Sequence, residues 1–297
     1  GNFKELVKRV TIDPCMLSYL DGVRCTRTAP NENYSRVLME LFTIGIGNYT
    51  QVDIQQAAKA LTGWQVSGLD ALFTPSRHDT ANKTFMGRTG NFDHNDIVDI
   101  IFEQAETARF ICRKLYKFFI YETPDETIVN QLADTFRNNN YEVRPVLRQL
   151  FTSAHFYNQL TISAEITSPI EKAVGAIRQM SIPLAPNSNI ITSYVRTAGE
   201  AFGQLLFEPP NVAGWPGYRL WISTTTLLAR NQYTDALVTG RTTIGNVNIG
   251  FKLNPITFAM QFPSPNDAVA LVNNIAAHLI ALSTSTARRQ MLLETLL

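Results

Sequence analysis

The chain has 297 residues, of which 45% are hydrophobic, and its formal net charge is +1. This length is enough to bury a large core, as one large domain or two smaller ones. Because the charge is nearly balanced and the basic residues are scattered, no nucleic-acid partner is expected. No apolar run is long enough to cross a bilayer, so no transmembrane segment is predicted.

Helical periodicity dominates the chain. Apolar residues recur at three- and four-residue spacing, which is typical of amphipathic helices. The segment from Thr50 to Asp53 resembles a capping box and opens one of them. In chain order, the pattern predicts helices at about 31–43, 50–61, 96–104, 106–121, 125–136, 141–151, 169–180, 190–206, 221–238, 266–281 and 284–296.

Strand signals are few. Residues 64–66 and 71–74, split by Ser67-Gly68, predict a small hairpin. Residues 181–189 and 239–265 predict loops, and the length of the second suggests a functional or mobile element. The fold class predicted is mostly α, an irregular multi-helix bundle with long loops and at most a small β-hairpin. We expect a single helical domain over 1–297, with room for a subdivision near 160–190.

A first polar motif lies on the predicted helix at 31–43. Glu32, Arg36 and Glu40 are four residues apart and share one side, with Asn33 beside them. One interpretation is a solvated ladder of ion pairs, each stabilising by roughly 0.3–0.5 kcal/mol. The other is an arginine held between two carboxylates at the edge of a catalytic cleft. Spacing alone favours the ladder.

A second candidate site is the polar loop that contains His78 and Asp79. A histidine beside an aspartate can move protons or bind a metal. Lys83 follows in the same segment and joins the candidate ligand-binding residues. The spacing is not that of a zinc site, so we predict no metal and no cofactor, and we expect Asn95 or Asp96 to cap the next helix. The nearest further ligands would be Asp93, His94 and Asp96.

A third motif, at 207–217, is stiff and aromatic. It holds two prolines, two glycines, Asn211 and Trp215, which are candidate ligand-binding residues. Aromatic rings with asparagine can form a carbohydrate-binding surface. They also form buried corners between helices, and we favour the corner because tryptophan is highly buried on average.

Common catalytic signatures are missing. The sequence contains no GxSxG elbow, HExxH, Walker A loop or GxGxxG after a strand. Cys15 and Cys25 are close enough in sequence to form a disulfide in an oxidising compartment, but free thiols are favoured.

The order of these motifs resembles the bacterial family called domain of unknown function 1800, over residues 13–230. Two positions depart from the family's pattern: Val37 stands where an acidic residue is usual, and Ala81 where glycine is usual. The match also begins partway into the family's usual extent, so an N-terminal helical portion is expected to precede it. The segments that carry the resemblance include Pro30-Asn31-Glu32-Asn33-Tyr34, Glu40-Leu41-Phe42, His78-Asp79, Ala108-Arg109-Phe110, Arg113-Lys114-Leu115 and Pro209-Pro210-Asn211-Val212.

The resemblance implies a helical protein exported to the periplasm or cell surface, although no signal peptide is visible here. It also implies a sulfatase-like partner or a glycan, and it names no reaction. Two functions follow as hypotheses. The first is a binding or scaffold module of the cell envelope. The second is a hydrolase-like enzyme whose polar cleft is built from Glu32, Arg36, Glu40, His78, Asp79 and Asn211.

Overall fold

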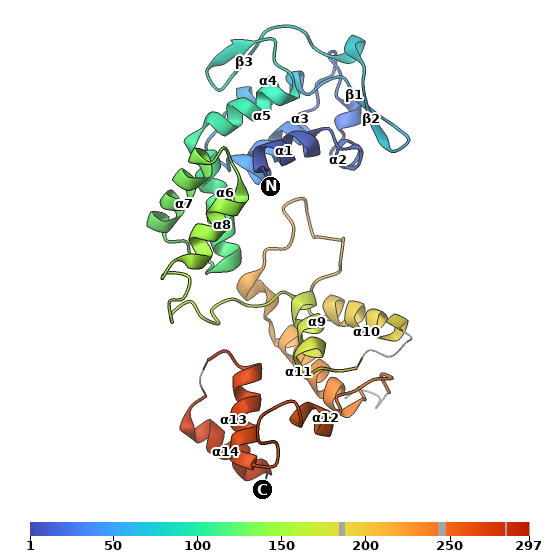
Figure 1. The fold of residues 1–297 in the computed structure, drawn as a ribbon. Coiled ribbons are helices and arrows are strands. Elements are labelled where there is room, and N and C mark those ends of the chain that lie inside the picture. Colours follow the sequence, from blue (N-terminus) through green and yellow to red (C-terminus); the bar gives the residue numbers. More distant parts are fainter. Residues whose placement is uncertain (184–187, 243–247, 283, 297) are drawn as a thin grey trace. The chain divides into compact units, whose positions relative to one another are not determined.

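The computed structural model describes residues 1–183, 188–242, 248–282 and 284–296 (Figure 1). It is mostly helical, with two small two-stranded antiparallel sheets, which confirms the predicted fold class. The chain divides into a first unit, Gly1–Asn158, and a second unit, Gln159–Leu297. The expectation of one domain over 1–297 stays a prediction. Among the described residues, no helix is both long and apolar enough to span a membrane.

The first unit is built from helices and two hairpins. Helices predicted to begin near 50, 96, 106, 125 and 141 are present with small shifts of their ends. The helices are α1 (Phe3–Thr11), α2 (Pro14–Tyr19), α3 (Glu32–Val37), α4 (Gln51–Ala60), α5 (His94–Glu103), α6 (Ala105–Phe119), α7 (Glu126–Asn138) and α8 (Val143–Thr152), with short 3₁₀ turns η1 (Gly22–Arg24) and η3 (Pro75–Arg77). The strands are β1 (Trp64–Ser67), β2 (Asp70–Phe73), β3 (Lys83–Phe85) and β4 (Arg88–Gly90).

A single apolar core runs through the first unit. Leu38, Met39, Phe85 and Phe136 are fully inaccessible to solvent, and each such side chain stabilises the fold by about 1.5–3 kcal/mol. Around this core α5 packs on α1, and α6 packs on α7. The core therefore holds α1 and α6 in place, and both contribute to the site described below.

The helix predicted at 31–43 is correct in extent but not in geometry. Its second half, η2 (Leu38–Thr43), is a π-helix. The amide of Ile44 donates to the carbonyl of Met39 at 3.1 Å, five residues back, and the Thr43 hydroxyl donates to the Leu38 carbonyl at 2.6 Å. π-Helical turns are rare and occur often at functional sites. The wider turn also ends the four-residue register that was expected to align Arg36 with Glu40.

The hairpin predicted near 64–74 is confirmed as β1–β2, while β3–β4 was not predicted. The β3–β4 turn is formed by Met86 and Gly87, which have φ of 46° and 80°. Two positive φ values define the turn type that suits a two-residue hairpin. The Asp53 carboxylate holds this turn, because it accepts the Met86 amide at 2.9 Å while also closing the capping box with Thr50.

The second unit has its own apolar core, which includes Ala173, Phe202, Tyr233 and Leu237. The sequence predicted all of its helices except α12, which lies inside the predicted loop 239–265. Residues 184–187 and 243–247 of the two predicted loops lie outside the described residues. The helices are α9 (Pro169–Gln179), α10 (Ser188–Ala201), α11 (Thr224–Thr239), α12 (Pro255–Ala259), α13 (Ala268–Leu279) and α14 (Thr286–Leu296), with a 3₁₀ turn η4 (Tyr218–Trp221).

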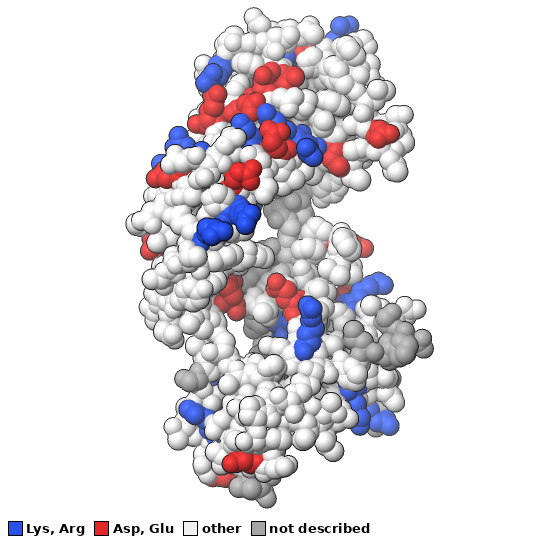
Figure 2. All heavy atoms as spheres, in the orientation of Figure 1, with Lys and Arg blue, Asp and Glu red and all other residues white. Residues whose placement is uncertain are grey.

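Charged side chains of both signs are interspersed on the face of the first unit that Figure 2 shows. Lys8 pairs with Asp99 at 2.9 Å, and Lys4 pairs with the same carboxylate at 3.2 Å. Two lysines of α1 thus pair with one aspartate of α5. This face carries no single-sign patch of the kind that attracts nucleic acid.

The link between Asp53 and the β3–β4 turn predicts a pH-dependent stability. Burial alone would raise the pKa of Asp53, but hydrogen bonds from the Thr50 hydroxyl and the Met86 and Thr50 amides outweigh it, so the pKa is lowered. A lowered folded-state pKa stabilises the fold above about pH 4, the ordinary range of aspartate, and this stability is lost as the pH falls further. Asp53→Asn should therefore cost about 1 kcal/mol at pH 7, and less below pH 4.

Urea denaturation followed by circular dichroism at several pH values measures this difference. Asp134 is exposed on α7, so Asp134→Asn serves as the control and should change stability by less than about 0.5 kcal/mol. A cost for Asp53→Asn that stays constant from pH 7 to pH 3 would contradict the role given to the carboxylate.

Candidate functional site

The first polar motif forms a surface network between α3 and α4. Arg36 Nη2 lies 3.3 Å from Glu32 Oε2, and it donates to Gln51 Oε1 at 3.0 Å. Gln51 Nε2 donates in turn to the same Glu32 oxygen at 2.7 Å. Glu40 instead accepts from the Tyr49 hydroxyl at 3.5 Å. Among the described residues Arg36 and Glu40 form no ion pair, so the predicted three-residue line is replaced by a pair that Gln51 braces.

Asn33 adds no side-chain bond to this network. Asn33 is exposed, and its backbone amide donates to Asn31 Oδ1 at 2.8 Å. Asn31 is the residue that caps α3. The ligand-binding roles predicted for this motif stay predictions.

His78 and Asp79 hold their loop against the end of α4. His78 Nδ1 lies 2.9 Å from the carbonyl oxygen of Thr62, so this nitrogen carries the proton and donates. The Asp79 amide donates to the Thr62 hydroxyl at 2.8 Å, and that hydroxyl donates to the Lys59 carbonyl at 2.7 Å. The Asp79 carboxylate accepts the amide of Ala81 at 2.8 Å. In the described part of the chain, no hydrogen bond or ion pair joins this loop to the first motif.

Lys83 is fully buried and its ammonium is saturated. Nζ donates to the Asp79 carbonyl, to Asn91 Oδ1 at 3.1 Å and to the Phe92 carbonyl at 3.1 Å. Burial lowers the pKa of Lys83, although nearby carboxylates, that of Asp79 foremost, act in the opposite direction. An ammonium has three donors, and all three are used here. Lys83 thus joins the loops on both sides of the β3–β4 hairpin, and its predicted contact with a ligand has no free donor to use.

The further candidate metal ligands also have structural partners. Asp93 caps α5 by accepting the amides of Asn95 at 2.7 Å and Asp96 at 3.1 Å, which corrects the prediction that Asn95 or Asp96 is the cap. The His94 ring lies edge-on to Trp64, with centroids 5.2 Å apart. Within the described residues, no group of three or more His, Cys, Asp or Glu could hold a metal ion. The three cysteines are free thiols, with Cys15 exposed and Cys25 and Cys112 buried.

The aromatic motif lies in the second unit, where it forms surface turns. The Asn211 side chain accepts the Ala213 amide at 2.9 Å, and its carbonyl accepts the Gly214 amide at 3.0 Å. Asn211 is exposed and Trp215 is half-buried, while Trp221 nearby is the buried ring. Both candidate residues stay predictions, as does a cleft that combines Asn211 with residues of the first unit.

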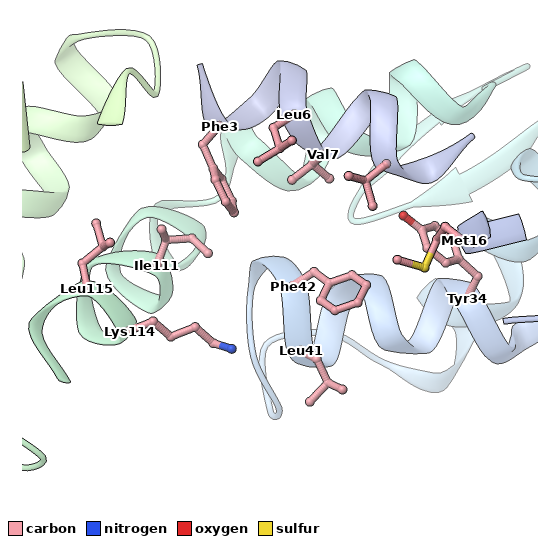
Figure 3. Close-up of a pocket in the computed structure, with 11 residues that line it drawn as sticks. Phe3, Leu6, Val7, Met16, Tyr34, Leu41, Phe42, Ile111, Lys114 and Leu115 are labelled. Carbon is pink, nitrogen blue, oxygen red and sulfur yellow. The ribbon is translucent and has the colours of Figure 1, made fainter. Parts of the chain in front are cut away.

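An apolar pocket of about 410 Å³ opens in the first unit between α1, η2 and α6 (Figure 3). Its walls carry a single charged side chain, that of Lys114. It is lined by Phe3, Leu6, Val7, Val10, Met16, Tyr34, Leu41, Phe42, Ile111, Lys114 and Leu115.

Tyr34 supplies the only hydroxyl in the pocket wall, and that hydroxyl is already bonded. It donates to Thr11 Oγ1 at 2.9 Å, and Thr11 donates to the Val7 carbonyl at 2.8 Å. Burial raises the pKa of Tyr34. The tyrosine is therefore neutral and anchored to α1, so it acts in this pocket as a rigid apolar wall.

Lys114 extends from α6 toward Phe42 on η2 (Figure 3). Its ammonium lies 5.0 Å from the centroid of the Phe110 ring, and it has no hydrogen bond or ion pair with any described residue. The side chain stays accessible to solvent, but partial burial lowers its pKa. A cation held over an aromatic ring without a counter-charge is a candidate contact for an anion.

The end of η2 lies directly against Phe110. Gly45 follows η2 with a φ of 80°, and a Cβ added to it would come within 2.6 Å of Phe110 Cδ2. Only glycine allows this close approach together with the left-handed backbone. Gly45 thus sets the distance between the η2 wall and the α6 wall.

Sequence reasoning missed this pocket. The apolar faces of 31–43 and 106–121 are typical of faces packed in a core, and no apolar face was assigned to the segment that forms α1. Leu41, Phe42 and Leu115 are only half-buried, so these faces are not fully covered. The one available signal was a lysine, Lys114, set within the strongly apolar face of its helix.

The model of the family described as "Protein of unknown function (DUF1800)" matches residues 1–297. No match was found among curated proteins or among solved structures. The match extends beyond the range 13–230 on which the resemblance was drawn, and it covers both units.

The saturated ammonium of Lys83 predicts a large loss of stability when it is removed. Lys83→Met removes the donor of three hydrogen bonds from a fully buried side chain, which should cost at least about 2 kcal/mol in urea denaturation. Lys117→Met, on an exposed ion-paired lysine of α6, is the matched control and should cost less than about 1 kcal/mol. Equal costs for the two variants would show that the Lys83 contacts do not stabilise the fold.

The contact at Gly45 predicts a difference between two glycines with similar backbones. Gly47 has a φ of 89°, and a Cβ added to it would meet nothing within 4 Å. Gly47→Ala should cost about 1–2 kcal/mol for the left-handed backbone alone. Gly45→Ala should cost about 1–3 kcal/mol more, because Phe110 must move. Thermal and urea denaturation measure the loss of stability in both variants. Equal losses would mean that the Phe110 ring moves away from the added methyl group without an energetic cost.

Proposed function

The chain belongs to the family of unknown function DUF1800, and we propose that it is a binding module whose ligand site is the apolar pocket of the first unit. The observation that carries this proposal is an open cavity of about 410 Å³ whose walls are almost wholly apolar. Ligand sites in proteins are typically about 300–1,000 Å³ and have mostly hydrophobic walls with few polar groups.

The walls of the pocket are fixed before any ligand binds. Val7 and Ile111 are buried at 6% exposure each and tie α1 and α6 to the core. Tyr34 is fixed by its hydrogen bond to Thr11. A preformed pocket spares the ligand the entropic cost of ordering it, which favours binding. The exposure of Leu6 at 53% leaves one side open for entry.

The structure supports the hydrolase-like alternative less well than it supports a binding module. Its candidate groups His78 and Asp79 are bonded to the backbone and hydroxyl of Thr62, and Glu32 and Arg36 are bonded to Gln51. These hydrogen bonds explain the four polar residues as groups that stabilise their own local structure. Export to the periplasm or cell surface, and a sulfatase-like or glycan partner, rest on the family resemblance and complete the proposal of an envelope module.

A neutral fluorescent probe tests the proposal. N-phenyl-1-naphthylamine should bind the full chain saturably, because the walls of the pocket are almost wholly apolar. Leu41→Trp fills the pocket and should weaken binding at least about tenfold, the equivalent of 1.4 kcal/mol. Leu69→Trp is the control, since Leu69 is 92% exposed in the β1–β2 turn and lines no part of this pocket.

Circular dichroism should show both variants folded before titration. The proposal fails if the unmodified chain shows no saturable binding, or if Leu41→Trp and Leu69→Trp bind the probe equally well.

A further inference from the structure

We infer that the pocket binds a single-chain amphipathic anion, an alkyl chain with a carboxylate head group that pairs with Lys114. The inference rests on the proposed binding function and names the ligand class for that site. It follows from three features of the pocket: its apolar walls, its one unneutralised cation and the position of that cation.

The walls select an alkyl chain. Ten of the eleven lining residues are aliphatic, aromatic or methionine, and the hydroxyl of Tyr34 among them is bonded to Thr11. A polar ligand would lose its hydrogen bonds to water and find no replacement on these walls. Each methylene placed there instead contributes roughly 0.8 kcal/mol of transfer free energy.

Lys114 is the one group in the walls that can recognise a head group. Its neighbours on α6 have their charges satisfied: Arg113 Nε lies 2.8 Å from Glu126 Oε1, and Lys117 Nζ lies 2.8 Å from Glu122 Oε1. Arg113 also pairs with Glu106, so the carboxylates closest in sequence are occupied. Lys114 alone on this stretch of α6 keeps an ammonium without a counter-charge among the described residues.

The position of the ammonium suits a head group rather than a chain. The side chain crosses from α6 toward Phe42, over the Phe110 ring, and remains accessible to solvent (Figure 3). A ligand can therefore place its chain between α1 and α6 while its carboxylate stays partly hydrated beside Nζ. Charge-assisted hydrogen bonds of this kind are roughly twice as strong as neutral ones.

The charge also argues against other ligands. A cationic amphiphile would face a like charge at the pocket rim. A neutral chain would gain the apolar contacts but leave the ammonium unpaired next to apolar walls. An alkyl carboxylate both contacts the apolar walls through its chain and pairs with the Lys114 ammonium through its head group.

Isothermal titration calorimetry of the full chain with decanoate and with decanol, below micelle formation, tests the inference. The two ligands share a chain and differ in the head group. Lys114→Met should weaken decanoate binding about tenfold and change decanol binding less than about twofold. Lys114→Arg keeps the charge and should retain decanoate binding within about threefold. Lys117→Met, one turn further along α6, should change neither ligand.

The outcomes separate the two proposals. If Lys114→Met leaves decanoate binding unchanged, or weakens both ligands equally, the anion inference is overturned while pocket binding stands. If neither ligand binds the unmodified chain and the neutral probe does not bind either, the proposed function fails as well. Circular dichroism of each variant confirms that a lost signal reflects binding rather than folding.

Discussion

The close approach of Gly45 to the Phe110 ring is the contact on which the rest of the site depends. It fixes the end of the π-helix against α6 at a distance that no side chain larger than hydrogen permits. On one side of this contact, η2 presents Leu41 and Phe42, and on the other, the Phe110 ring holds the ammonium of Lys114. The η2 wall and the α6 wall of the pocket therefore meet at this contact, while α1 supplies the facing wall.

Most polar side chains of the first two motifs are hydrogen-bonded to neighbouring groups of the first unit. Lys83 and Thr62 tie the loop of His78 and Asp79 to its surroundings. Elsewhere in the first unit, Arg113 bonds Glu126 and so joins α6 to α7. Burial of polar groups is costly unless their hydrogen bonds are satisfied, so such residues recur where loops cross a core. The hydrogen bonds that these residues form therefore stabilise local structure.

Local signals predicted most helices because caps and apolar periodicity act within one turn. The capping box of Thr50 and Asp53 and the left-handed Gly240 that ends α11 are examples. The π-helix was missed because six residues of wider turn barely alter a helical pattern. The β3–β4 hairpin was missed because Met86 adopts a positive φ that a distant carboxylate, Asp53, holds in place. Asp53 and Met86 are 33 positions apart in the chain, so local propensity cannot predict the hydrogen bond between them.

The pocket could not be predicted for the same reason, since its walls come from segments around residues 3, 41 and 114. A crystal structure of the full chain with 10-bromodecanoate tests the account most directly, because bromine scatters anomalously. The account predicts a bromine peak between α1 and α6 and a carboxylate beside Lys114 Nζ. A pocket without the ligand, or a ligand whose carboxylate lies away from Lys114, would contradict it.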